Sequence, residues 1–315
     1  MKKKAILLMG PTASGKTDLS LKLANFLPVE IISVDSALIY RDMNIGTAKP
    51  SELEQNQVKH HLIDILSPLE TYSVFNFLQD TEKLINDINC RGKIAILVGG
   101  TMMYYNAILK GISRLPPSNI LIKQQIEDKI NQLGLEKLYN ELKEIDIKSA
   151  QKINVNDKQR IIRALEVYYI SGVSLSQLQQ DNWYSPLQDV SFLNLSLIPK
   201  RETLHHRINI RLDSMLNNGL IDEVVHLQKK YSELTKEHNS MRCVGYYEVW
   251  NYLENIYSYD ELLFKSKAVT RQLAKRQITW LNSINNYNLL ENSESCDLDN
   301  KLITSVLDII NSWIK

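Results

Sequence analysis

The chain is poor in cysteine, and this excludes two kinds of cross-linked scaffold. Its 315 residues include only Cys90, Cys243 and Cys296, an odd number that contains no C-x-x-C pair. A disulfide framework or a structural zinc site requires paired or clustered cysteines. We therefore expect no zinc and no disulfide framework, and we interpret the three thiols as reduced and without a special role.

Long apolar runs and an excess of charge of one sign are also missing. A membrane-spanning helix needs about 18 consecutive apolar residues, and no run approaches that length. The apolar run at residues 5–9 is too short for a signal peptide, and no small-residue cleavage site follows it. We expect a cytoplasmic protein that contacts no membrane. The formal net charge is +1, so any nucleic acid must be bound by local basic patches.

Short apolar runs alternate with helix-like stretches in the first hundred residues. Strands are predicted at residues 5–9, 29–34 and 94–98, and helices at residues 18–26 and 72–89. Strands separated by helices require crossover connections, which give a parallel sheet with helices on both faces. The predicted fold class is therefore α/β.

The sequence changes in character after Pro116-Pro117. Residues 120–180 have the apolar spacing of helices throughout. A strand at residues 191–198 then returns to the sheet. We predict an inserted all-helical subdomain at residues 115–189, between two parts of a catalytic core at residues 1–114 and 190–315.

The C-terminal part of the core is predicted to be mainly helical. Helices are expected at residues 201–217, 220–231 and 259–282, and residues 285–300 are polar and loop-like. The last helix carries Leu302, Val306, Ile310 and Trp313 on one stripe. Such a stripe is most simply a core face.

A glycine-rich loop follows the first predicted strand. Residues 10–17 read Gly-Pro-Thr-Ala-Ser-Gly-Lys-Thr, which matches G-x-x-x-x-G-K-T in the strand-to-helix context that the motif requires. Glycines let backbone N–H groups turn inward, and the N-terminus of the following helix favours an anion. Lys16 adds a positive charge and Thr17 offers a hydroxyl to Mg²⁺. We predict a P-loop NTPase-like sheet whose polyphosphate-binding residues are Gly10, Pro11, Thr12, Ala13, Ser14, Gly15, Lys16 and Thr17, with Thr17 as the metal ligand.

The loop indicates a polyphosphate but not a reaction. A typical P-loop NTPase also holds Mg²⁺ with an acidic residue on a later strand, whereas the strand at residues 94–98 ends in Gly-Gly-Thr101. An acid stands instead at the end of the second strand, as Asp35. Carboxyl ends of parallel strands face the ligand crevice, so we expect Asp35 and Thr101 near the bound ligand. A role as helix N-cap or turn former is the alternative for Asp35.

Basic residues gather in two of the predicted helices. Five basic residues and no acidic one lie between Leu262 and Leu290, and Lys267, Arg271 and Lys275 share one helix face. This composition suits an RNA backbone, with a solvated helix face as the alternative. A second group includes Arg207 and Arg211, which are placed to reach a diphosphate or RNA or else to form surface ion pairs.

The chain closely resembles bacterial tRNA dimethylallyltransferases, also called tRNA isopentenyltransferases. The resemblance extends from residue 5 to about residue 285, nearly the whole chain. It rests on the glycine-rich loop and on the segments 32–40 (Ile-Ser-Val-Asp-Ser-Ala-Leu-Ile-Tyr), 44–50, 61–64, 98–101, 159–167, 242–246 and 270–281.

The resemblance implies a reaction and roles for individual residues. A dimethylallyl group would pass from dimethylallyl diphosphate to the exocyclic N6 amine of the adenosine immediately 3′ of the anticodon, with release of diphosphate and with Mg²⁺ as cofactor. Asp35 would act as the base and Thr101 would help to position the nucleophile. Arg211 would lie near the reacting groups, and Lys16 would offset charge on the departing diphosphate.

The same match implies an extended contact with tRNA. The insertion would grip the anticodon stem by shape and phosphates, and a monomer suits a protein that must surround its substrate. Tyr247 and Asn282 stand where relatives often carry a basic residue, and the zinc-finger extension of eukaryotic relatives is absent. The implied tRNA contacts are Asp35, Ser36, Ala37, Leu38, Thr101, Lys123, Gln159, Arg160, Ile161, Ile162, Arg163, Arg242, Cys243, Val244, Gly245, Tyr246, Tyr247, Lys275, Arg276, Gln277, Ile278, Thr279, Trp280, Leu281 and Asn282.

Three other functions stay open at this point. A prenyltransferase of free adenine nucleotides shares the loop and the aspartate, but it does not need the basic helix or the insertion. A P-loop nucleoside or nucleotide kinase is disfavoured by the acid-free tip of the third strand. A non-catalytic RNA-binding protein is disfavoured by the intact Lys16, Thr17 and Asp35.

Overall fold

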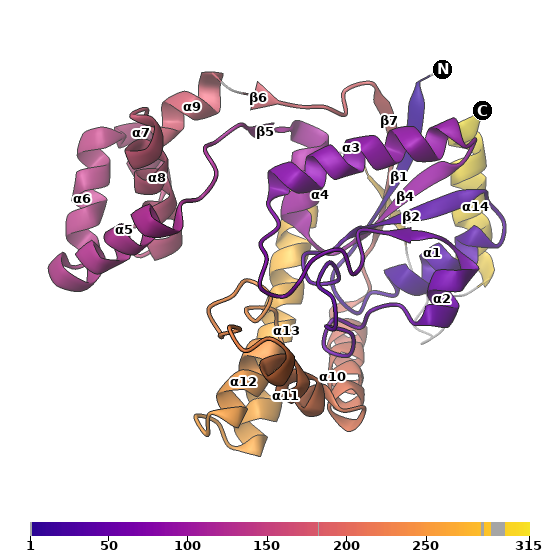
Figure 1. The fold of residues 1–315 in the computed structure, drawn as a ribbon. Coiled ribbons are helices and arrows are strands. Elements are labelled where there is room, and N and C mark those ends of the chain that lie inside the picture. The colour runs from indigo at the N-terminus through magenta and orange to yellow at the C-terminus, as the bar shows by residue number, and fades with distance from the viewer. Residues whose placement is uncertain (1, 182, 285–286, 291–299) are drawn as a thin grey trace. The chain divides into compact units, whose positions relative to one another are not determined.

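The computed structural model describes residues 2–181, 183–284, 287–290 and 300–315 (Figure 1). The chain divides into two compact units. One consists of Met1–Asn106 with Leu187–Lys315, and the other of Ala107–Pro186. These divisions lie within eight residues of the predicted boundaries of the insertion, 115–189. Cys296 and most of the loop expected at residues 285–300 lie outside the described residues.

The first unit is built on a six-stranded sheet in the order β3-β2-β4-β1-β7-β8, in which every neighbouring pair is parallel. The predicted α/β class is confirmed. The four longer strands coincide with the predicted ones. β3 and β8 were not predicted, because two or three residues carry no readable periodicity. The strands are β1 (Lys3–Met9), β2 (Val29–Val34), β3 (His60–His61), β4 (Ile94–Gly99), β7 (Val190–Leu197) and β8 (Asn288–Leu290).

Helices cover both faces of this sheet. Ile6 and Leu8 of β1 pack with α1 (Lys16–Ala24) and α14 (Asn300–Ile314) in one hydrophobic cluster. The apolar stripe of the last helix enters this cluster, as predicted. α3 (Val74–Cys90) contacts β1, β2 and β4 and covers the opposite face (Figure 1). Two short helices, α2 (Glu52–Gln57) and α4 (Met102–Lys110), were not predicted.

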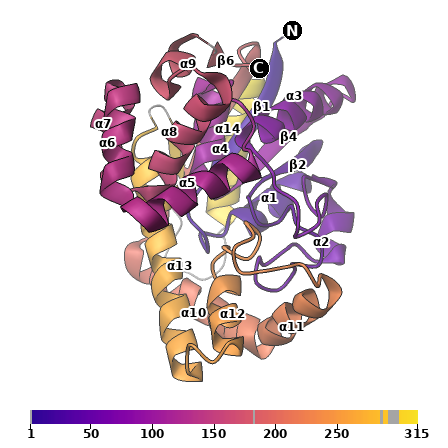
Figure 2. The same cartoon turned by 60° about the vertical axis from the view of Figure 1, so that its left-hand side comes forward.

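The C-terminal helices of the first unit form a second cluster. α10 (Arg201–Asn217) and α13 (Tyr259–Leu281) lie side by side in both views (Figures 1 and 2). α11 (Leu220–Lys230) and α12 (Tyr246–Leu253) pack with them. α12 was not predicted, because it has only eight residues and begins at a glycine with φ +96° rather than at a polar cap.

The second unit has its own hydrophobic core. Ile126, Leu138, Leu142, Ile161 and Leu165 meet in this core, which confirms the predicted helices of residues 120–180. A two-stranded antiparallel pair, β5 (Ile112–Ser113) with β6 (Trp183–Tyr184), adds a feature that was not predicted. The helices are α5 (Ile120–Leu133), α6 (Leu135–Ile145), α7 (Ile147–Lys152), α8 (Lys158–Ser171) and α9 (Leu175–Asp181).

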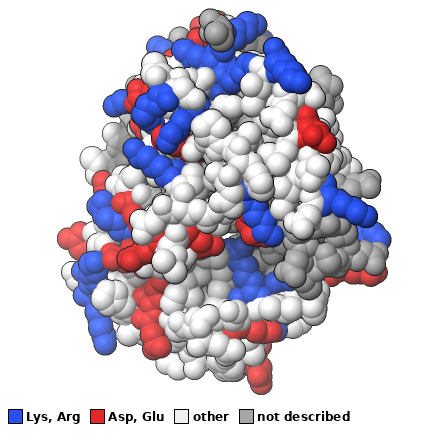
Figure 3. All heavy atoms as spheres, turned by 90° about the vertical axis from the view of Figure 1, so that its right-hand side faces the viewer, with Lys and Arg blue, Asp and Glu red and all other residues white. Residues whose placement is uncertain are grey.

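Within the described part of the chain, no helix combines the length and the apolar composition needed to cross a bilayer. On the face drawn in Figure 3, Lys and Arg side chains are interspersed with Asp and Glu. This mixed pattern agrees with the formal net charge of +1.

Candidate active site

A cavity of about 1340 Å³ opens at the carboxyl ends of the strands, within the first unit. It is lined by the glycine-rich loop, the ends of β2 and β4, the segment 46–50, and parts of α10 and α13. The structure therefore brings together many of the predicted site residues. Those that line it are Thr12, Ala13, Ser14, Gly15, Lys16, Thr17, Asp35, Ser36, Ala37, Leu38, Thr101, Arg211, Arg242, Cys243, Val244, Arg276, Gln277 and Trp280.

The glycine-rich loop is shaped by its two glycines. A Cβ on Gly10 would lie 2.5 Å from the carbonyl oxygen of Leu197 in β7, so no other residue fits there without movement. Gly15 has φ +97°, a conformation that L-residues rarely adopt, and it precedes the first turn of α1. The loop therefore turns against β7 and opens toward the N-terminus of a helix, where anions are favoured.

Lys16 is held inside this loop with only 8% of its surface exposed. Its Nζ donates to the carbonyl of Pro11 at 2.6 Å and lies 3.3 Å from Ser14 Oγ. The pKa of Lys16 is lowered to about 7, mainly by burial and also by the charge of Arg211, while Asp35 opposes this effect. A desolvated ammonium that pairs with no carboxylate among the described residues is prepared to bind an anion such as a phosphate.

Two arginines of α10 reach the same loop region. Arg207 Nη1 donates to the carbonyl of Ser14 at 3.2 Å, and Arg211 Nη2 donates to the carbonyl of Thr47 at 3.3 Å. Both side chains line the cavity. Burial lowers the pKa of Arg211, and the nearby Asp35 opposes this. Both hydrogen bonds join α10 to segments that line the cavity.

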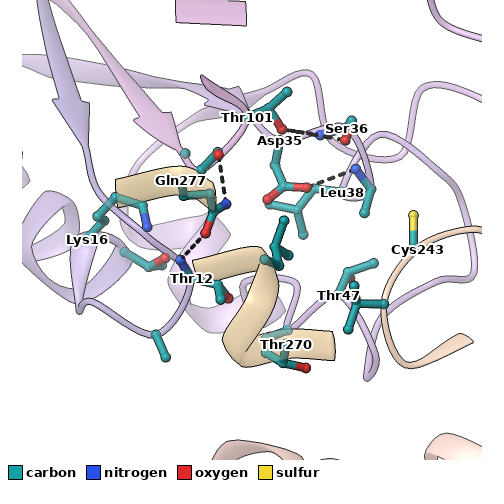
Figure 4. Close-up of a pocket in the computed structure, with 18 of the residues that line it drawn as sticks. Thr12, Lys16, Asp35, Ser36, Leu38, Thr47, Thr101, Cys243, Thr270 and Gln277 are labelled. Carbon is teal, nitrogen blue, oxygen red and sulfur yellow. Dashed lines mark hydrogen bonds between the residues drawn. The ribbon is translucent and has the colours of Figure 1, made fainter. Parts of the chain in front are cut away.

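Asp35 and Thr101 stand at the ends of the neighbouring strands β2 and β4. Asp35 Oδ1 accepts the Ala37 N–H at 2.8 Å, and Thr101 Oγ1 accepts the Ser36 N–H at 3.1 Å (Figure 4). The backbone turn after β2 thus orients both side chains. Asp35 acts as a turn former through one oxygen and still lines the cavity.

Gln277 connects the glycine-rich loop with the end of β4. Its Oε1 accepts the Thr12 N–H at 2.8 Å, and its Nε2 donates to the carbonyl of Gly100 at 2.7 Å (Figure 4). Both polar groups of this buried amide are therefore used inside the protein.

The segment 44–46 is bound by a carboxylate that sequence analysis did not find. Glu223 accepts the N–H groups of Asn44, Ile45 and Gly46 at 2.9, 2.8 and 3.2 Å. The next residue, Thr47, supplies the carbonyl that holds Arg211. No local sequence signal marks Glu223, because its partners lie about 178 positions away along the chain.

The basic face of α13 is largely used in helix packing. Lys267 forms an ion pair with Asp213 at 2.7 Å, and Arg271 Nη2 donates to Asn209 Oδ1 at 2.8 Å. Both partners belong to α10. In this structure Lys267 and Arg271 join two helices of the same unit, and the RNA contact expected of this helix face stays a prediction.

Four side chains in the implied tRNA set lie in hydrophobic cores. Ile161 and Ile162 belong to the core of the second unit, and Tyr246 and Leu281 are fully buried in the first. Their side chains pack in these cores, and the contact with tRNA expected at these positions stays a prediction. Ile278 is partly buried and packs against a small hydrophobic cluster that includes Leu204 of α10.

The remaining residues of that set differ in exposure. Lys275, Arg276, Thr279, Trp280 and Asn282 are exposed at the C-terminal end of α13, and Tyr247 is half-buried in α12. Arg242 is exposed and forms an ion pair with Glu237 at 2.6 Å. Burial raises the pKa of Cys243 to about 12, with a further contribution from Asp35.

In the second unit, the implied contact residues differ in exposure, and Arg160, like Arg163, forms an ion pair, with Asp157 at 2.6 Å. Lys123, Gln159 and Arg160 are at least partly exposed. Arg163 instead donates to Glu166 at 2.7 Å and to the carbonyl of Pro116 at 2.6 Å. Arg163 therefore joins the beginning of the insertion to α8.

Comparisons with known proteins agree with this architecture. Residues 38–284 match the family described as IPP transferase. A tRNA dimethylallyltransferase of Chromobacterium violaceum is 49% identical over 281 residues, which cover 89% of this chain and 86% of that protein. Similarity at this level, over this length, extends beyond the sheet and includes the insertion.

Solved structures give the same result. The crystal structure of the full-length tRNA isopentenylpyrophosphate transferase of Bacillus halodurans is 34% identical, with a TM-score of 0.71 over 99% of this chain and 96% of that one. A eukaryotic dimethylallyltransferase acting on tRNA is 28% identical, with a TM-score of 0.81 over 99% of this chain and 79% of that one. The glycine-rich loop, Asp35 and Thr101 at the strand ends, and the insertion are all present. On these matches, this chain belongs to the IPP transferase family.

Proposed function

We propose that this chain transfers a dimethylallyl group from dimethylallyl diphosphate to the N6 amine of the adenosine immediately 3′ of the anticodon in tRNA. The observation that carries the proposal is the position of Asp35 and Thr101. Both line the cavity that the glycine-rich loop opens into, so a base and a polar anchor face a diphosphate site. Prenyl transfer to an amine needs this combination.

The donor diphosphate binds at the glycine-rich loop. Lys16 supplies a partly desolvated charge, and Arg207 and Arg211 line the cavity from α10. As the carbon–oxygen bond of the donor breaks, its electron pair moves to the diphosphate. These cationic groups stabilise the growing negative charge, which is the largest contribution that a preorganised site of this kind makes.

The acceptor amine is bound at the ends of β2 and β4. Asp35 has one oxygen fixed by the Ala37 N–H, which leaves the other to accept a proton from the adenine amine. The amine nitrogen forms the new bond to the allylic carbon and passes its proton to Asp35. Thr101, oriented by the Ser36 N–H, helps to position the nucleophilic amine.

Mg²⁺ fits the donor set without a dedicated protein cage. Among the described residues, no three His, Cys, Asp or Glu side chains gather into a cation site. Mg²⁺ commonly keeps several waters and is bound through substrate phosphates with few protein ligands. Thr17, exposed beside the loop, supplies the hydroxyl. Bound there, the ion would neutralise charge on the diphosphate.

RNA binding uses exposed residues of both units. Arg276 and Trp280 line the cavity from α13, and a tryptophan that is 43% exposed can stack on an unpaired base. Lys123 and Arg160 of the insertion contact phosphates. The protein acts as a cytoplasmic monomer.

The test supplies radiolabelled dimethylallyl diphosphate and Mg²⁺ with two acceptors in parallel, unmodified tRNA that has adenosine 3′ of the anticodon, and AMP. Label in tRNA alone is the expected result. Label in AMP would instead identify a free-nucleotide prenyltransferase. Phosphate transfer or ATP hydrolysis, with no label in either acceptor, would identify a kinase-like enzyme and refute the proposal.

A further inference from the structure

A buried glutamine of α13 lies between the two halves of the catalytic site. Gln277 is only 8% exposed. Its amide joins the Thr12 N–H of the glycine-rich loop to the Gly100 carbonyl at the end of β4, at 2.8 and 2.7 Å (Figure 4). One side of the amide thus holds the donor loop, and the other holds the residue immediately before Thr101.

The fit around this amide leaves no free space on the Gly100 side. A Cβ on Gly100 would lie 2.5 Å from Gln277 Nε2 and 3.7 Å from the carbonyl oxygen of Gly10. The glycine-rich loop and the β4 end therefore approach each other closely with Gln277 between them. A side chain that cannot bond on both sides would let this separation change.

The distance between the two loops matters for the chemistry. The donor carbon and the acceptor nitrogen must approach within roughly 3 to 3.5 Å in good alignment, and a misplacement of about 1 Å can lower the rate about 100-fold. The donor is bound by one loop and the acceptor beside the other. The group that fixes their separation therefore contributes to kcat without touching either substrate.

We propose that Gln277 is a positioning residue that holds the donor loop in register with Thr101. This inference rests on the proposed function. It also replaces the expected RNA contact of Gln277 with an internal role. Because Arg276 and Trp280 of the same helix line the cavity, α13 would connect tRNA binding to the geometry of the donor loop.

The test compares Gln277→Met with Gln272→Met. Methionine keeps the length of the glutamine but removes both hydrogen bonds, and Gln272 is an exposed glutamine of the same helix outside the cavity lining. We expect Gln277→Met to lower kcat by about 10- to 100-fold. Its tRNA Kd, measured without donor, should stay within about twofold of wild type, since the rate loss does not act through RNA affinity. Gln272→Met should match wild type in both.

A second variant guards against loss of folding in the first. Gly100→Ala keeps Gln277 but pushes its amide away from the β4 carbonyl. It should reproduce the kcat loss with unchanged tRNA affinity. Unchanged kcat in both variants would overturn the inference, and so would a tRNA Kd that weakens as much as the rate falls. A wild-type protein that labels no tRNA would instead refute the proposed function.

Discussion

The carboxylate of Glu223 accepts the Tyr246 hydroxyl at 2.5 Å and also receives three backbone N–H groups of the segment 44–46. A Cβ on Gly46 would lie 2.5 Å from the Tyr246 ring, so the two segments are in close contact. Two stretches that carry the family resemblance, 44–50 and 242–246, therefore meet at a residue that belongs to neither. Through Thr47, the first stretch also holds Arg211.

Glu223→Ala is expected to lower both stability and turnover. It leaves three partly exposed N–H groups and the hydroxyl of Tyr246 without their acceptor, each worth about 1 kcal/mol. It also loosens the segment that holds Arg211. We expect a loss of about 2 to 4 kcal/mol in urea unfolding and a clear fall in kcat. The exposed Glu233→Ala serves as the control. Unchanged kcat would show that the segment does not position Arg211.

Tyr246→Phe tests whether this tyrosine acts in the core or at the RNA. Removing its hydroxyl takes one hydrogen bond from Glu223 and should cost about 1 kcal/mol of stability. Because the ring is fully buried, the tRNA Kd should not change. Weaker tRNA binding with full stability would restore the expectation of a direct contact.

Asp35→Asn should remove the base while keeping the turn, because the amide oxygen can still accept the Ala37 N–H. Loss of a general base typically lowers the rate by about 10² to 10⁴. We expect a fall of that size in kcat with nearly unchanged tRNA affinity. Asp87→Asn, an exposed carboxylate on α3, is the control. Equal losses of binding and rate would contradict the role as base.

The affinity for inorganic diphosphate should fall as the pH rises through about 7. In the free protein the pKa of Lys16 is lowered to about 7, and a bound anion favours the protonated amine. Binding therefore takes up a proton above this pH and weakens as protons become scarce. Calorimetry at pH 6 to 8.5 should show a steeper decline for wild type than for Lys16→Met. The ionisation of diphosphate is common to both proteins, so parallel profiles would exclude Lys16 as the source.

Glu30 should make the free energy of unfolding depend on pH in the acidic range. This carboxylate is 2% exposed, and burial would raise its pKa, but hydrogen bonds from Arg91, His61 and Lys93 bring the pKa to about 2. Its contribution is present above pH 4.5 and is lost as the pH falls toward 2, where the native carboxylate is protonated. A shift of this size corresponds to about 3 kcal/mol. Urea unfolding at pH 6 and pH 3 should show a smaller pH dependence for Glu30→Gln.

Two arginines one helical turn apart should behave differently. Arg160→Ala should weaken tRNA binding and reduce the salt slope by about 1. It should change stability little, because Arg160 is exposed and a surface ion pair such as the one with Asp157 contributes little. Arg163→Ala should leave the buried Glu166 without its ion pair and increase hydrogen exchange within α5 and α8. The opposite assignment of these effects would place the RNA contact at Arg163.

The sequence predicted the elements that carry a strong local pattern. The four long strands, α10 and α13 have clear periodicity, and the glycine-rich loop carries its own motif. Short elements such as β3 and α12 depend on contacts with distant segments, so no local window identifies them. The same difference decides which site residues could be predicted. Asp35 and Thr101 could be placed in the site because strand ends meet at one edge of a sheet. Glu223 and the internal role of Gln277 depend on packing between helices and loops.

The contact between Gly10 and the Leu197 carbonyl has a consequence for the order in which the protein is made. The glycine-rich loop is among the first segments to be synthesised, but the strand behind it follows the entire insertion. A nascent chain that ends before β7 therefore presents the loop without its backing and leaves one side of β1 unpaired. Such unpaired strand edges are prone to aggregation. The insertion has its own core, and its two ends pair as β5 and β6. Its early folding would therefore shorten the time before β7 can pair with β1.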